Sequence, residues 1–84
     1  MGRQRTLLEK VLRGDSDASI AFNDLCRLLA SLGFEERSKG SHHIFRRAGV
    51  EERINLQRDG KHAKTYQVRQ VRAVILRYRL GGDL

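Results

Sequence analysis

Residues 40–47 read Gly-Ser-His-His-Ile-Phe-Arg-Arg, and the topology of this chain depends on them. The small Gly-Ser pair predicts a tight turn, and the segment from His43 to Arg47 predicts a strand after it. Two of the three histidines stand at this turn, and imidazole is the side chain whose unperturbed pKa suits proton transfer near neutral pH. Arginines follow at once, and a guanidinium binds phosphate through paired hydrogen bonds. The stretch therefore indicates chemistry on a nucleic acid backbone.

Strand signals lie on both sides of this turn. Residues 34–39 predict a polar strand before it, and residues 48–51 predict the next turn. Residues 53–57 then alternate, with Ile54 and Leu56 on one face. The middle strand has two adjacent apolar residues, so alternation alone does not give its facing. Strands joined by short turns pair antiparallel, and we predict a three-stranded antiparallel sheet.

Two helices are predicted before these strands. Residues 4–13 form the first, and Gly14 ends it. Asn23 is the expected N-cap of the second helix, and Gly33 is expected just after its last turn. Between the helices, the residues around position 20 predict a short extended piece. The apolar stripe of the second helix comprises Leu25, Cys26, Leu28, Leu29 and Leu32.

A third helix is predicted near the end of the chain. Thr65 is its expected N-cap, residues 66–79 form it, and residues 59–60 precede it as a loop. Its predicted inward stripe is Val68, Val71, Ile75 and Tyr78, and its basic surface is Arg69, Arg72, Arg77 and Arg79. Such a basic helix face is usually solvated, and contact with RNA or a protein partner is the sharper alternative. The element order favours an α+β fold with helices on one face of the sheet and the other face open.

Positive charge is concentrated in the second part of the chain. The 84 residues carry 17 Lys and Arg against 10 Asp and Glu, a formal net charge of +7. The net charge is +1 over residues 1–33 and +6 over residues 34–84. A solvated surface would account for a basic composition, but concentration of the charge around the histidines favours a polyanionic partner. The length suits one small domain with one modest core.

Several classes of protein are disfavoured. No apolar run approaches the length of a membrane helix, and the basic N-terminus lacks the apolar region of a signal peptide. The single cysteine, Cys26, lies in an apolar helical pattern and predicts a buried structural thiol. The histidines and this cysteine do not reproduce a zinc-binding spacing, so no metal and no cofactor are predicted. We expect a cytoplasmic protein.

A set of motifs, taken in order, resembles the HicA family. The set is Leu32-Gly33-Phe34 at the end of a helix, then Lys39-Gly40-Ser41-His42, an aromatic residue, a basic pair and an alternating third strand. HicA proteins are toxins of bacterial and archaeal toxin–antitoxin pairs. They cleave mRNA without a metal, have a fold like the double-stranded-RNA-binding domain, and are neutralised by a HicB antitoxin. The resemblance implies a HicA-like domain over residues 18–84, with residues 1–17 as an N-terminal helical extension.

The resemblance also implies roles for individual residues. The family's catalytic histidine follows Gly-Ser or Gly-Asp directly, which corresponds to His42. His43 is less suited to the same phosphate, because adjacent strand residues point to opposite faces. Many family members carry Pro and His after the third strand, where this chain has Gln57-Arg58-Asp59-Gly60, so the second acid or base stays undefined. The expected RNA contacts are Lys39, Ser41, His43, Arg46, Arg47, Arg53, Lys61 and Lys64.

Two functions remain open from the sequence. The first is a metal-independent endoribonuclease toxin that cleaves mRNA with His42 and binds a HicB-like antitoxin. The second is a non-catalytic RNA-binding module of the same fold, in which His42 is an exposed polar residue at a turn. A histidine directly after the Gly-Ser turn has no required part in passive binding, which favours the enzyme.

Overall fold

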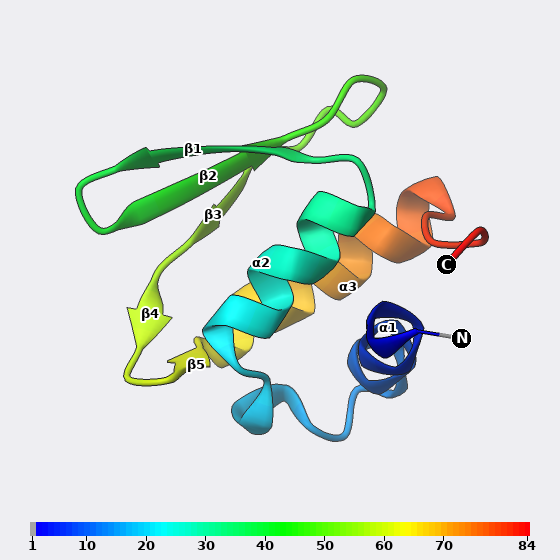
Figure 1. Ribbon diagram of the computed structural model, residues 1–84, viewed down its shortest axis with the longest axis horizontal. Coiled ribbons are helices and arrows are strands. Elements are labelled where there is room, and N and C mark those ends of the chain that lie inside the picture. Colours follow the sequence, from blue (N-terminus) through cyan, green and yellow to red (C-terminus); the bar gives the residue numbers. More distant parts are fainter. Residues whose placement is uncertain (1) are drawn as a thin grey trace.

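Three helices and two small sheets make up the described part of the chain, residues 2–84 of a computed structural model. The elements in order are α1 (Arg3–Arg13), the 3-10 helix η1 (Asp17–Ser19), α2 (Phe22–Ser31), β1 (Glu35–Lys39), β2 (His42–Arg46), β3 (Ile54–Leu56), β4 (Arg58–Asp59), β5 (His62–Ala63) and α3 (Thr65–Tyr78). Helices α2 and α3 cover one face of the β1-β2-β3 sheet, and α1 packs against these two helices away from the sheet (Figure 1). The predicted α+β class is confirmed, and the arrangement is consistent with a double-stranded-RNA-binding-domain-like fold.

The three-stranded sheet is antiparallel throughout, as predicted. Lys39 lies opposite His42 across the β1–β2 turn, and Phe45 lies opposite Ile54 between β2 and β3. Residues directly opposite in such a ladder share a face. Phe45, Ile54 and Leu56 are buried beneath the helices, whereas His42 and Asn55 are exposed on the other face. The sheet therefore has one face in the core and one open face.

A single apolar core joins all the layers. It comprises Leu8, Val11, Ile20, Phe22, Leu25, Leu28, Leu29, Leu32, Phe34, Phe45, Ile54, Leu56, Ala63, Val68, Val71, Val74 and Ile75. Helix α1 contributes the first two, so the core extends into the segment predicted to be an extension. Assignment of residues 1–17 as an extension and residues 18–84 as the domain stays a prediction.

The end of α2 follows the prediction for Gly33. This glycine has φ 94°, a left-handed conformation that a side chain would disfavour. The backbone N–H of Gly33 donates to Ala30, and that of Phe34 donates to Leu29. This pair of bonds is the Schellman motif, which satisfies the last carbonyl groups of a helix. The buried ring of Phe34 then leads the chain into β1.

Both predicted N-caps were wrong by one or two residues. Helix α2 begins after Ala21 rather than Asn23, and α3 begins after Lys64 rather than Thr65. Neither helix has a side-chain cap. The carboxamide of Asn23 instead accepts a hydrogen bond from Arg58 at 2.8 Å. A tertiary partner thus uses the oxygen that a cap would have used.

The predicted loop before α3 contains a second hairpin. Strands β4 and β5 pair antiparallel on either side of the turn at Gly60. The predicted extended piece near residue 20 joins this hairpin, because the N–H of Phe22 donates to Lys61 and the N–H of Ala63 donates to Ile20. The hairpin therefore ties the start of α2 to the start of α3.

The arginines of α3 do not form one solvated surface. Arg72 is only 20% exposed and makes two hydrogen bonds to Asp17, at 2.8 and 3.1 Å. These bonds hold the pKa of Asp17 below its ordinary value. Arg72 also donates to the backbone carbonyl of Val11. It therefore connects α3 to η1 and α1, and the expectation that it is a surface residue was wrong.

The loop between β2 and β3 is fastened to the end of α3. The hydroxyl of Tyr78 donates to Glu52 at 2.7 Å, and Arg77 donates to the same carboxylate at 2.9 Å. The Tyr78 hydroxyl is the main cause of a lowered pKa at Glu52. These contacts hold the loop that sets the register between β2 and β3.

Candidate nucleic-acid interface

His42 opens strand β2 directly after the Gly40-Ser41 turn. Its side chain is exposed on the open face of the sheet, opposite Lys39 of β1. Gly40 has φ 62°, which allows the tight reversal of the chain at this point. The turn thus presents the imidazole at the edge of an uncovered surface.

Two amide side chains flank the imidazole, that of Asn55 in β3 and that of Gln57 just after this strand. The Nδ1 atom of His42 lies 3.3 Å from Oδ1 of Asn55, and its Nε2 atom lies 3.4 Å from Nε2 of Gln57. A carboxamide oxygen only accepts and a carboxamide nitrogen only donates. With the amides in these orientations, a proton on Nδ1 and a lone pair on Nε2 satisfy both contacts. This tautomer presents Nε2 as the basic nitrogen.

The position of Gln57 is itself fixed by the core. Gln67 of α3 is 2% exposed, and its side-chain oxygen accepts the backbone N–H of Gln57 at 3.2 Å. A buried polar group of this kind is costly unless it is bonded, so the contact holds the end of β3 against α3. The core is thereby connected to the residue that faces His42.

His43 has a different environment on the helix side of the sheet. Its ring packs edge-on against Phe22, with centroids 5.0 Å apart. Its Nδ1 atom lies 2.5 Å from a carboxylate oxygen of Glu36 and 3.3 Å from the hydroxyl of Ser38. The structure therefore separates the two adjacent histidines, as strand geometry predicts, and places His43 away from the open face.

The predicted RNA-binding residues are divided among three places. Lys39, Arg46 and Arg53 share the open face with His42. Arg47 lies on the other side of β2 and packs against Gly33. A side chain at Gly33 would crowd it, because a Cβ atom there would lie only 3.3 Å from the Nε atom of Arg47. Arg46 and Arg47 therefore lie on opposite sides of β2 and do not form a single phosphate contact.

The remaining predicted contacts lie at turns. Ser41 is exposed in the β1–β2 turn, and Lys61 and Lys64 flank β5 at the start of α3. The two lysines belong to a different surface of the molecule, beside His62. They are not brought together with His42.

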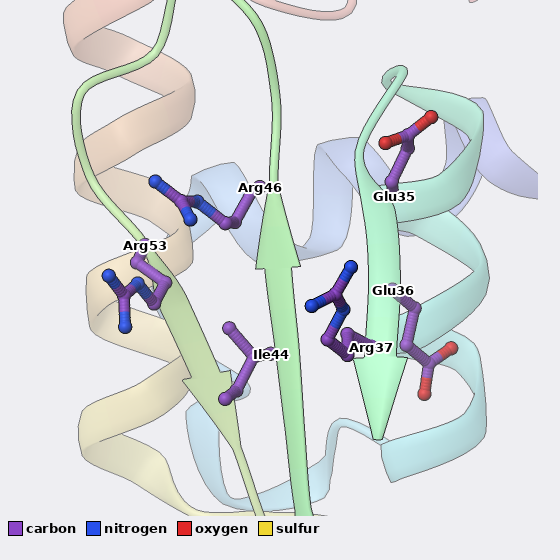
Figure 2. A pocket seen from close by; sticks show the side chains of 6 residues that line it. All are labelled: Glu35, Glu36, Arg37, Ile44, Arg46 and Arg53. Carbon is purple, nitrogen blue, oxygen red and sulfur yellow. The ribbon is translucent and has the colours of Figure 1, made fainter. Parts of the chain in front are cut away.

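A hollow on the open face collects further basic residues. It has a volume of about 490 Å³ and is lined by Glu35, Glu36, Arg37, Ile44, Arg46 and Arg53 (Figure 2). Arg37 was not among the predicted site residues, and neither were Asn55, Gln57 and Gln67. The alternation of residues 53–57 was the available signal, because it already placed Arg53, Asn55 and Gln57 on one face.

The other chemically notable side chains do not form a second centre. Burial, reinforced by the nearby Glu36 carboxylate, raises the pKa of the Cys26 thiol to about 11, so this thiol is a poor nucleophile. Within residues 2–84, no three His, Cys, Asp or Glu side chains gather as metal ligands. No helix in the same range has the length and apolar character to cross a membrane.

Comparison with known families decides the assignment. A family model described as HicA toxin of bacterial toxin–antitoxin matches residues 22–77, two thirds of the chain. The chain belongs to the HicA toxin family. It is therefore a toxin of a toxin–antitoxin system, and an antitoxin partner is implied. Comparison with curated proteins and with solved structures finds no match.

Proposed function

We propose that this HicA-family toxin is an endoribonuclease that cleaves mRNA without a metal ion, with His42 as its catalytic base or acid. The observation that supports this most strongly is the environment of His42. Its two ring nitrogens face Asn55 and Gln57, and the ring stands on an open sheet face together with the basic residues Lys39, Arg46 and Arg53.

The proposed reaction is an internal displacement on one phosphate of the RNA. A bond forms between the ribose 2′ oxygen and phosphorus, and the bond from phosphorus to the 5′ oxygen breaks. One proton leaves the 2′-OH and one proton reaches the departing 5′ oxygen, giving a 2′,3′-cyclic phosphate and a 5′-hydroxyl. An imidazole suits either transfer near neutral pH. Cationic groups stabilise charge on the phosphoryl oxygens, and Lys39, which lies opposite His42, is the group proposed for this role.

The carboxamide of Gln57 suits both protonation states of the imidazole. Its NH₂ group donates to the lone pair of neutral Nε2, and after rotation its oxygen accepts from a protonated Nε2. Asn55 needs no change, because Nδ1 carries a proton in both states. In the proposed mechanism the ribose 2′-OH takes the place of the Gln57 amide at Nε2, and the amide then stabilises the imidazolium.

A HicB-like antitoxin with an acidic surface is the proposed partner. The open sheet face is basic, and charge complementarity speeds encounter and selects the partner. An antitoxin that covers His42 would block RNA by occlusion. Both an mRNA substrate and such a partner place the proposed activity in the cytoplasm. Co-expression with the adjacent reading frame, followed by pull-down and a cleavage assay, tests this part of the proposal.

The test of the catalytic proposal compares His42→Ala with His62→Ala. Both histidines are exposed, but His62 lies in β5 away from the open face. We expect His42→Ala to lower the rate of RNA cleavage by at least about 100-fold, and His62→Ala to cleave as the parent does. The cleavage should persist in EDTA and leave cyclic phosphate ends.

Three results would contradict the proposal. His42→Ala protein that cleaves at the parental rate would remove the histidine from the mechanism. Loss of activity on chelation, restored by Mg²⁺ or Zn²⁺, would remove metal independence. A parent protein that binds RNA and never cuts it would favour the non-catalytic RNA-binding module.

A further inference from the structure

Three arginines from three neighbouring segments of the sheet region surround Ile44 on the open face. Arg37 comes from β1, Arg46 from β2 and Arg53 from the segment leading into β3, and their side chains rise around the apolar residue (Figure 2). In the described residues 2–84, none of the three makes an ion pair, although Glu35 and Glu36 line the same hollow. By contrast, Arg72 and Arg77 are bound to carboxylates. Three arginines against two carboxylates leave the hollow with a net positive charge, which favours binding of an anion.

We propose that this arginine hollow binds a phosphate of a single-stranded RNA substrate, on the same strand as the phosphate that is cut but not adjacent to it. The proposal rests on the proposed function, because it takes His42 as the place of cleavage. A guanidinium matches the geometry of phosphate oxygens with paired hydrogen bonds. The hollow also has the volume of an ordinary ligand site.

The position of the hollow relative to His42 supports an RNA strand as its occupant. His42, Ile44 and Arg46 alternate along β2 and therefore share the open face. Arg46 follows His42 by four positions along β2, about 13 Å at the usual rise per residue. An RNA strand that runs along β2 would place one phosphate at His42 and another among the arginines. The side chain of Ile44 would lie between them, against a ribose or a base.

The small width of the site favours a single strand over a duplex. Three strands span only about 10 Å between the outer two. Domains that read double-stranded RNA contact about 16 base pairs across two successive minor grooves. Unstacked bases of a single strand can instead lie on guanidinium planes. The residues that line this hollow include three arginines and no aromatic residue, so the guanidinium groups are the planes on which a base could stack.

The experiment compares two triple variants with equal charge. Arg37→Gln/Arg46→Gln/Arg53→Gln removes the hollow, and Arg3→Gln/Arg69→Gln/Arg79→Gln removes three exposed arginines that lie on α1 and α3 or at the end of α3. Each lowers the formal net charge from +7 by three, to +4. The ligand is a 2′-O-methyl RNA of about ten nucleotides, which cannot react and covers a typical single-strand site. Binding is measured over a range of salt concentrations, and urea unfolding checks that both variants fold.

We expect the hollow variant to lose about tenfold or more in affinity at 0.1 M salt and the control to lose much less. The slope of log affinity against log salt should fall by about 2 in the hollow variant, since each lost single-strand contact removes about 0.7. A dinucleotide, too short to reach from His42 to the hollow, should bind both variants alike. If the triple variant does not fold, the RNA affinities of the single variants Arg46→Gln and Arg69→Gln are compared instead, since each variant removes one positive charge.

Two outcomes would overturn the proposal. Equal losses in the two triple variants would mean that net charge alone governs binding. Parental RNA affinity in the hollow variant, together with loss of the antitoxin in a pull-down, would make the hollow a protein-docking site. Because the ligand cannot be cleaved, absence of ribonuclease activity in the parent would refute the proposed function and leave this binding result intact.

Discussion

The two faces of the β1-β2-β3 sheet use adjacent residues of one sequence for opposite purposes. On the helix side, Phe45 is fully buried and His43 is bonded to Glu36 and packed on Phe22. On the open side, His42 is exposed and is flanked by two amide side chains. One face satisfies its polar groups internally, and on the other, as far as the described residues 2–84 go, Lys39, Arg37, Arg46 and Arg53 make no ion pair.

This difference indicates where stability and function are located. Burial and bonded polar groups hold a fold together, while unpaired charges on an exposed surface contribute little to stability. Substitutions on the helix side should therefore change the free energy of unfolding, and substitutions on the open side should change RNA binding and cleavage.

The largest effect is expected for a pair of neighbouring apolar residues in β2. Phe45→Ala should lower the free energy of unfolding by about 3–5 kcal/mol, because it leaves a cavity beneath the helices. Ile44→Ala, on the open face, should cost about 1 kcal/mol or less, because Ile44 is only half-buried. Urea unfolding of both variants measures the difference. Similar losses would mean that the open face is covered in solution.

Much of the contrast between the faces could be predicted from the sequence. Alternation from Ile54 to Leu56 located β3 and its buried side, because a half-buried strand must alternate. Gly33 marked the end of α2, because a left-handed residue was needed there. The position of His42 directly after a Gly-Ser turn also followed from the sequence, although the strand begins at His42 and not at His43 as predicted.

The contacts of the site could not be predicted in the same way. Which residue lies opposite His42 depends on the path of the loop through Glu52, and that path depends on a tertiary contact with Tyr78. The sequence likewise could not separate Arg72 from Arg69. Both are arginines of one helix, but only Arg72 meets the 3-10 helix at Asp17. Registers and ion pairs of this kind are set by packing between segments distant in sequence.

The second prediction concerns that ion pair. Asp17→Asn should lower the free energy of unfolding at neutral pH by about 1.5–3 kcal/mol, the usual worth of hydrogen bonds to a charged group. The pKa of Asp17 is lowered in the folded protein, so its contribution is fully present above the ordinary value of 3.8. The contribution should be lost as pH falls through the lowered folded value.

Unfolding measured from neutral pH to about pH 2 tests this sign, since that range covers the ordinary carboxylate values. The parent should lose stability on acidification, and the Asp17→Asn variant should converge with it at the acid end. Glu35→Gln serves as the matched control, because the Glu35 carboxylate makes no ion pair within residues 2–84. A gap between parent and Asp17→Asn that stays constant with pH would show that the pair is not the cause.

The third prediction concerns the positioning of His42 on the open face. Asn55→Ala should lower kcat/KM for RNA cleavage by about tenfold, since the imidazole loses the partner that fixes its orientation. Asn55→Asp should instead strengthen the bond to Nδ1–H, stabilise the imidazolium and move the pH–rate profile to higher pH. Both variants should unfold as the parent does, because Asn55 is exposed. A role limited to folding would leave the pH profile in place.

The smallest expected effect is a difference in the free energy of unfolding between substitutions of the two adjacent histidines. His43→Gln should lower the free energy of unfolding by about 1 kcal/mol, because it removes an aromatic contact with Phe22 and disturbs the bond to Glu36. His42→Gln should change it by less than about 0.5 kcal/mol, as for other exposed positions. The two substitutions are chemically identical and one residue apart, so composition and local propensity cancel in the comparison.

A double-mutant cycle of His43→Gln with Glu36→Gln then isolates the imidazole–carboxylate contact, since the effects of bonded residues do not add. Equal effects of the two histidine substitutions, or additive effects in the cycle, would mean that the helix side does not hold His43 in place and that both imidazoles are free to meet RNA.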